Sequence, residues 1–278
     1  MTLDAVREEP TVTYQIETDS RYSWFRLVVT MLVAVIANAG MWAIIVIMPA
    51  VEAEFGASRA AASMPYTLNM IGFALGNLVI GRALDRFGVT MSLILAALGI
   101  VAGLVLAILS HSIAMLSLAQ FIVGLASAVG FGPLIADISH WFVRRRGIAV
   151  ALVASGNYLS GAIWPMLLAE VLASEGWRAS YTVLAIATCV GVIPLALLLR
   201  RATSAETRDA AQLASNLNAQ ASGISPRMLA YLLGFAGISC CVAMSMPQVH
   251  IVSLCVDMGF GPAAGAEMLS LMLLGGVG

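Results

Sequence analysis

The chain has 278 residues, of which 60% are hydrophobic and only 10% are charged, and its net charge is −1. Soluble domains carry about 25% charged residues, so this composition excludes a protein whose main solvent is water. The small net charge also argues against a nucleic-acid-binding protein, because arginines occur only in short clusters between apolar runs.

The N-terminal segment, residues 1–23, is polar and slightly acidic. A cleaved signal peptide would have a basic start and a short apolar run close to the N-terminus. Here the first apolar run is instead long enough to cross a membrane. We therefore expect residues 1–23 to form a disordered tail, and the arginine distribution described below places that tail in the cytoplasm.

Seven apolar stretches follow, each of 21 to 25 residues without a formal charge. The hydrocarbon core of a bilayer is ~30 Å thick, and about 20 helical residues with a rise of roughly 1.5 Å each cross it. Because lipid offers no partner for backbone N–H and C=O groups, such stretches must be helices. The sequence thus predicts an all-α integral membrane protein. The stretches are residues 27–51, 60–81, 87–110, 112–136, 147–169, 179–199 and 228–249.

An eighth apolar stretch, residues 268–278, ends with the sequence itself. A helix of that length is too short to cross the hydrocarbon core. We therefore expect a truncated eighth span, which either an incomplete sequence or a defective product would explain.

The arginines indicate how the spans are oriented. Twelve of them precede the first span or lie between spans two and three, four and five, or six and seven, which share one face if the spans alternate in direction. The positive-inside rule assigns that face to the cytoplasm. We expect a multi-pass protein of the plasma (inner) membrane with a cytoplasmic N-terminus. The twelve are Arg7, Arg21, Arg26, Arg82, Arg86, Arg144, Arg145, Arg146, Arg200, Arg201, Arg208 and Arg227.

Residues 201–226 are the only long polar connection, and they divide the spans into two sets. The predicted parts are the tail 1–23, a six-helix transmembrane bundle at 24–200, a cytoplasmic central loop at 201–226 and the start of a second bundle at 227–278. Six spans, a linker and a second set are typical of transporters built from two halves.

The connection between spans two and three carries a motif. Residues 81–88 read GRALDRFG, which resembles the signature loop of the major facilitator superfamily at this same connection. Gly81 and Gly88 permit a tight reversal, and Asp85 can pair with an arginine such as Arg86. The two basic residues that usually follow the second glycine are Val89 and Thr90 here.

A second match lies between spans four and five, where Asp137 and Arg144 resemble the acidic and basic residues that the superfamily places against the first loop. The resemblance implies a six-helix major-facilitator bundle, with a seventh span and a truncated eighth. It also implies a conformational gate at the cytoplasmic surface that holds the outward-open state. The predicted gate residues are Gly81, Asp85, Arg86, Gly88, Asp137 and Arg144.

Three segments are similar to one branch of that superfamily, the monocarboxylate porters and oxalate–formate exchangers. They are residues 54–59 (EFGASR), residues 141–149 (WFVRRRGIA) and the residues around Val249 and 256–260 (VDMGF). Proton-coupled members often carry an arginine four residues before a glycine in span four. Gln120 holds that position before Gly124, so the arginine for that type of proton coupling is missing.

The resemblance places a substrate near the bilayer midplane, where a polar side chain needs a reason to be buried. Residues 130–133 (GFGP) in span four predict a helix irregularity that frees backbone carbonyls. The asparagines could equally join helices, and His250 could be solvated at the extracellular end of span seven. The predicted substrate-binding residues are Asn38, Trp42, Asn69, Asn157, Tyr158, Gln248 and His250.

The predicted function is secondary active transport of a small organic anion, similar to a monocarboxylate, by alternating access. An anion at the midplane needs a cation beside it, and no span contains an arginine or lysine in its interior. The counter-charge would then come from missing spans, and we expect this chain alone not to transport. Membrane lipid and the substrate are the expected partners, and a proton or a counter-substrate stays open as the coupled species.

Two other functions remain open, namely an exporter of drugs or neutral solutes and a truncated fragment that does not transport. An enzyme is disfavoured, because the chain has no H-E-x-x-H motif, no paired intramembrane aspartates and no nucleophile elbow. We expect no catalytic residues, cofactor, metal or nucleic-acid partner.

Overall fold

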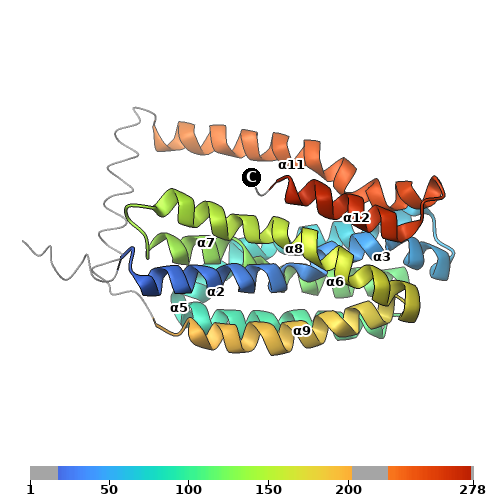
Figure 1. Cartoon of the computed structure of the whole chain (residues 1–278), viewed down its shortest axis with the longest axis horizontal. Helices are drawn as coiled ribbons and strands as arrows, with labels where there is room; N and C mark the ends of the chain where they lie inside the picture. The colour runs from blue at the N-terminus through green and yellow to red at the C-terminus, as the bar shows by residue number, and fades with distance from the viewer. Residues whose placement is uncertain (1–17, 202–224, 277–278) are drawn as a thin grey trace, which may run out of the picture.

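The computed structural model describes residues 18–201 and 225–276, apart from the side chains of Asp85 and Pro226. All regular elements within these residues are helices (Figure 1). The predicted tail and central loop lie mostly outside the described residues. Residues 18–23 are the exception, because they were expected to be disordered and are instead ordered. Ser20 caps a helix that begins at Arg21, and its hydroxyl accepts the backbone N–H of Ser23.

Seven helical segments are long and apolar enough to cross a membrane within the described part of the chain, in agreement with the sequence prediction. The first span is divided into α2 (Arg21–Ala37) and α3 (Ala39–Phe55). A short helix α4 (Arg59–Ala62) precedes α5 (Met64–Ile108), which holds spans two and three. The fourth span consists of α6 (Ile113–Ser127), the 3-10 turn η1 (Ala128–Gly130) and α7 (Gly132–Ser139). Spans five, six and seven are α8 (Arg146–Glu175), α9 (Trp177–Leu198) and α11 (Pro226–Asp257).

The eighth apolar stretch belongs to α12 (Gly261–Leu274), a helix of 14 residues. It begins seven residues before the predicted start at Met268, because Glu267 interrupts a run without charge but does not interrupt a helix. Gly88 divides α5 into its two spans with a φ of 73°, a conformation that glycine adopts readily. The predicted reversal between spans two and three is therefore present.

The two ends of the helix bundle differ in charge. We name the end that carries Arg21, Arg86 and Arg200 the basic end, and the end that carries Glu54 and Asp257 the acidic end. Figure 1 shows the helices running side by side between these ends, with the start of α2 on the left at the basic end. Because successive spans alternate in direction, residues far apart in sequence meet at each end.

The interior of the first bundle is built around α3 and the contact of α5 with α6. All residues from 39 to 48 are buried, as expected for a helix surrounded by other helices. A Cβ added to Gly124 in α6 would come within 2.0 Å of the Asn69 carbonyl oxygen, and one added to Gly72 within 2.3 Å of the Phe121 carbonyl oxygen. These glycines allow the two backbones to approach closely.

Helix α11 contacts the first bundle at one end only. Residues 227–247 are exposed apart from Leu229 and Met244, which are partly exposed. Val249 instead packs with Met48 and Ala62 near the acidic end. Figure 1 accordingly shows α11 standing apart at the basic end and lying against α12 at the acidic end.

Candidate functional site

Spans one and four are both interrupted, and their interruptions touch. Asn38 separates α2 from α3, and Phe131, with φ −129° and ψ −89°, separates η1 from α7. The Asn38 side-chain amide donates to the carbonyl of Ala34 at 2.8 Å and to the carbonyl of Gly130 at 3.2 Å. The irregularity predicted at residues 130–133 is confirmed, whereas the interruption of span one at Asn38 was not predicted.

Two tryptophans fasten span five to span one. Trp164 Nε1 donates to the carbonyl of Val35 at 3.0 Å, just before the interruption of span one. Trp42 Nε1 donates in the other direction, to the carbonyl of Asn157 at 3.1 Å. Both rings are buried, and each indole N–H has the hydrogen-bond partner that a buried tryptophan usually finds. Spans one and five are thereby held together as one unit.

Three buried polar side chains connect spans two, four and six. Asn69 donates to Gln120 at 2.7 Å, and Gln120 donates to the Tyr181 hydroxyl at 2.5 Å. None of the three is exposed at all. Asn69, one of the predicted substrate residues, therefore lies inside the first bundle in an interhelical hydrogen bond.

The other predicted substrate residues divide into two groups. Asn38, Trp42 and Asn157 lie at the joint of spans one, four and five. Asn157 is partly buried, and its side chain makes no hydrogen bond to the residues that the structure describes.

The second group faces the start of the second bundle. The Tyr158 ring lies beside Gly276, past the end of α12. Gln248 is 9% exposed and His250 is partly exposed, and they flank Val249 in the contact of α11 with the first bundle. The two groups meet on α8, because Asn157 and Tyr158 are consecutive residues of that helix.

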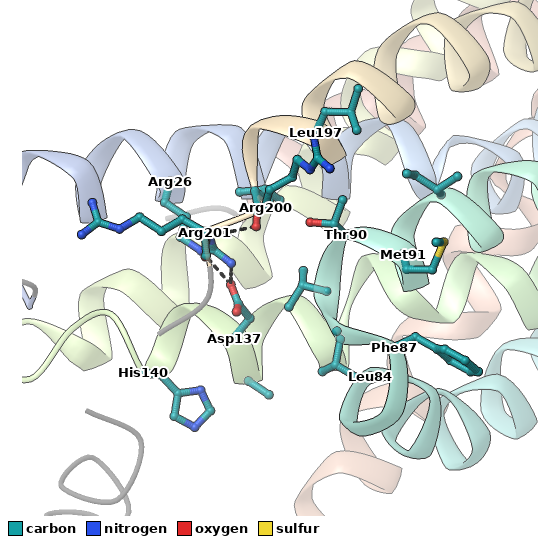
Figure 2. A pocket seen from close by; sticks show the side chains of 15 residues that line it. Arg26, Leu84, Phe87, Thr90, Met91, Asp137, His140, Leu197, Arg200 and Arg201 are labelled. Carbon is teal, nitrogen blue, oxygen red and sulfur yellow. Dashed lines mark hydrogen bonds and ion pairs between the residues drawn. The ribbon is translucent and has the colours of Figure 1, made fainter. Parts of the chain in front are cut away.

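A cavity of about 680 Å³ lies at the basic end, between the part of α5 around Gly88, the end of α7 and the end of α9. Figure 2 shows Arg26 reaching Asp137 in its wall. Arg26 Nε and Nη2 donate to Asp137 Oδ2 at 2.9 and 2.8 Å, and Nη1 donates to the carbonyls of Leu199 and Arg201. The guanidinium also lies 4.7 Å from the centre of the Trp141 ring.

The Arg26–Asp137 ion pair was missed by the sequence reasoning, which treated Arg26 as a flanking residue of span one. The helix in fact begins before Arg26, and its side chain is only 1% exposed. Asp137 was expected to face the loop at 81–88. It lines one cavity with Leu84 and Gly88 of that loop, and among the described side chains its ion pair is with Arg26.

The remaining predicted gate residues lie at the basic end without forming a closed cluster. Gly81, Arg86, Gly88 and Arg144 are exposed, and the side chain of Asp85 lies outside the described part of the chain. The backbone N–H groups of Val143, Arg144 and Arg145 bind the carboxylate of Asp19, which fixes the connection between spans four and five. The gate stays a prediction.

The acidic end holds an ion pair that joins the first bundle to the second. Arg59 donates two parallel hydrogen bonds to Asp257 at 2.5 and 2.8 Å, and its Nε lies 3.5 Å from Glu52. A second arginine at this end, Arg178, pairs with Glu54 within the first bundle. Neither pair was predicted, although each basic residue lies within a few positions of a span end.

No group of three or more His, Cys, Asp or Glu side chains is placed to hold a metal ion among the residues that the structure describes. The arrangement offers hydrogen-bonding amides at a joint of interrupted helices, together with charged pairs at both ends.

The family model of the Major Facilitator Superfamily matches residues 30–278. The chain is 38% identical over 126 residues to MFS-type transporter pynF of Aspergillus niger. The matched region covers 45% of this chain and 28% of the relative. It is 31% identical over 171 residues to Monocarboxylate transporter 6 of Homo sapiens, covering 59% of this chain and 33% of the relative. It is 33% identical over 109 residues to the Fujikurins efflux protein of Gibberella fujikuroi, covering 38% and 23%.

In each of these three cases the matched part spans a third of the relative's length or less. The similarity therefore concerns one portion of each relative.

Proposed function

Because the chain belongs to the major facilitator superfamily, we propose that it carries a small organic anion of the monocarboxylate type across the membrane by alternating access. The observation that carries the substrate class is the similarity to Monocarboxylate transporter 6 over 59% of this chain. The chain belongs to a family of multi-pass membrane transporters, and its transport activity and its substrate are the parts that we propose.

The Asn157 amide is the group that we propose to contact the substrate first. It lies at the joint of spans one and five, and its side chain has no hydrogen-bond partner among the described residues. The buried atom without a partner is the Asn157 Oδ1 acceptor, which is costly. A substrate hydroxyl could donate to Oδ1, and a substrate carboxylate could accept the N–H groups of the same amide. Tyr158, the next residue, faces the second bundle and would close the site from that side.

The charge of the substrate needs a cation that the joint does not supply. Arg26 is a buried cation of the first bundle, but Asp137 and two backbone carbonyls already accept its N–H groups. We therefore assign the first bundle the hydrogen-bonding part of the site and the second bundle the counter-charge.

Transport by the complete protein tests this assignment. Vesicles loaded with one organic acid are exposed to a panel of labelled mono- and dicarboxylates, and we expect exchange with the monocarboxylates. Asn157→Ala should raise the KM for the preferred acid. Ser155→Ala is the matched control, because the Ser155 hydroxyl binds the carbonyl of Leu152 in its own helix. Equal KM values for the two variants would contradict the role of Asn157.

Export of a neutral solute is the second candidate. It is favoured by the uncharged side chains at the joint, Asn38, Trp42 and Asn157, and by the similarity to the Fujikurins efflux protein. The same exchange assay, with labelled neutral solutes added to the panel, separates the two, because a neutral solute that exchanges while all organic acids fail would establish the exporter.

We propose that the basic end faces the cytoplasm of a cell whose plasma (inner) membrane holds the protein, as the positive-inside rule requires. An epitope inserted after Gln212 should bind antibody only after permeabilisation. Binding to intact cells would reverse the orientation.

We also propose that residues 81–88, with Asp137 and Arg144, close the basic end during transport. The separation of α11 from the bundle at that end supports a conformation in which this gate is open. Asp85→Asn should slow turnover more than it weakens substrate binding, and an unchanged transport rate would contradict the gate.

A further inference from the structure

The cavity at the basic end combines two kinds of wall. Arg200, Arg201 and His140 contribute basic or polar groups, and Phe87, Met91 and Leu197 contribute apolar ones. Figure 2 shows these side chains around one opening, with Phe87 and Met91 on a different side from Arg201 and His140. A ligand that fills the cavity would therefore meet charge on one side and hydrocarbon on the other.

Among the described residues that line the cavity, Arg200 carries a positive charge without an anionic partner. The Arg26 and Asp137 charges cancel each other in their ion pair, and the Arg201 guanidinium lies over the Tyr22 ring at 5.1 Å. Arg200 is exposed and makes no ion pair with a described residue, and the Thr90 hydroxyl lines the same cavity. A guanidinium and a hydroxyl suit a phosphate group, because arginine binds phosphate through paired N–H donors.

The apolar wall continues onto the lipid-facing surface of the bundle. Phe87, Met91 and Leu197 are about half exposed, and the exposed face extends to Leu95 on α5 and Val190 on α9. In a membrane protein such a face contacts acyl chains. A soluble anion would use only the basic wall, whereas a lipid would use both walls at once.

We propose that this cavity binds one anionic phospholipid of the leaflet beside the basic end. Its phosphate contacts Arg200 and the Thr90 hydroxyl, and its acyl chains follow Phe87, Met91 and Leu197 out to the bilayer. Basic pockets between membrane helices bind anionic headgroups in this manner. The site lies on α5, α7 and α9, away from the joint of spans one, four and five.

Lipid binding to the complete protein in detergent tests the proposal, with phosphatidylglycerol as the probe and native mass spectrometry as the measurement. We expect phosphatidylglycerol to bind and phosphatidylcholine to bind at least fivefold more weakly. Arg200→Gln should weaken phosphatidylglycerol binding at least fivefold. Arg82→Gln is the control, because Arg82 is exposed at the same end but lies outside the cavity, bonded to the carbonyl of Leu78.

Two further arms decide the source of the anion and the role of the apolar wall. Glycerol phosphate should compete poorly, and Met91→Gln should weaken phosphatidylglycerol without changing glycerol phosphate binding. Equal losses in Arg200→Gln and Arg82→Gln would reduce the effect to general surface charge and overturn the site. Glycerol phosphate that displaces the lipid at comparable concentration would show a site for free anions and overturn the lipid assignment.

Discussion

The two ends of the molecule each hold an arginine–aspartate pair, and the pairs differ in burial and in what they join. At the basic end Arg26 and Asp137 have side chains that are 1% and 10% exposed, and they join spans of the same bundle. At the acidic end Arg59 and Asp257 are 39% and 49% exposed, and they join the first bundle to α11. A buried charge cannot lose its partner without a large cost, whereas an exposed one can exchange its partner for water.

This difference fits the motions that alternating access requires. The halves of such a transporter move against each other as largely rigid bodies, so contacts inside a half should be permanent and contacts between halves should be releasable. The buried pair lies inside one half, and the exposed pair lies across the contact between the two halves. Breaking the two pairs should therefore affect different quantities, namely stability in one case and the balance of conformations in the other.

The largest expected effect follows from Asp137→Asn. The substitution leaves the Arg26 charge buried without its anion, which costs about 3–5 kcal/mol in buried pairs. Thermal or chemical unfolding in detergent should show a loss of that order. The double variant Arg26→Met with Asp137→Leu should recover part of it, because no charge then remains buried. A loss below about 1 kcal/mol in Asp137→Asn would mean that water reaches the pair, and the contrast between the two ends would fail.

Much of the fold could be predicted from the sequence because the solvent is lipid. Lipid requires every span to be a helix of sufficient length, so charge-free runs identified the seven spans and their order. The irregularity at residues 130–133 was also predictable, because glycine and proline act through local backbone chemistry. Asn38 carries no such local signal, since its interruption of span one depends on a contact with Gly130, 92 residues away.

The ion pairs were not predictable for a related reason. Counting charge-free residues ends a span at the first arginine, so Arg26 was placed outside span one. The anion that allows the arginine to be buried is Asp137, which lies 111 residues further along the chain. Arg59 and Asp257 are separated by 198 residues. Local patterns indicate which residues cross the membrane, but partners across helices depend on packing.

The second expected effect concerns the buried polar chain inside the first bundle. Gln120→Leu leaves Asn69 without its acceptor and Tyr181 without its donor, and both side chains are fully buried. We expect a loss of about 1–2 kcal/mol of unfolding free energy, since hydrogen bonds between membrane helices are individually modest. Tyr181→Phe keeps the bond between Asn69 and Gln120, so its loss should be smaller. The reverse order would show that the tyrosine, and not the glutamine, carries the chain.

The third expected effect measures the fastening of spans one and five. Trp164→Phe keeps most of the ring but removes the N–H that binds the Val35 carbonyl, at a cost of about 1 kcal/mol. Trp141→Phe is the matched control, because the buried Trp141 N–H has no hydrogen-bond partner among the described residues. Unfolding in detergent should separate the two variants, and equal losses would assign the effect to ring volume alone.

The smallest effect on stability is expected at the acidic end, where it should appear as a shift between conformations. Arg59→Gln removes two hydrogen bonds to Asp257 on α11, yet both side chains already contact water, so the unfolding midpoint should change little. The population open at the acidic end should rise by less than about fivefold. Distances between spin labels near Ala57 and Gly259 would report it. Glu52→Gln is the control, since Glu52 lies on the same half as Arg59 and its loss leaves the connection to α11 intact. If Glu52→Gln shifts the distances as far as Arg59→Gln does, local rearrangement of Arg59, and not the link between the halves, controls that end.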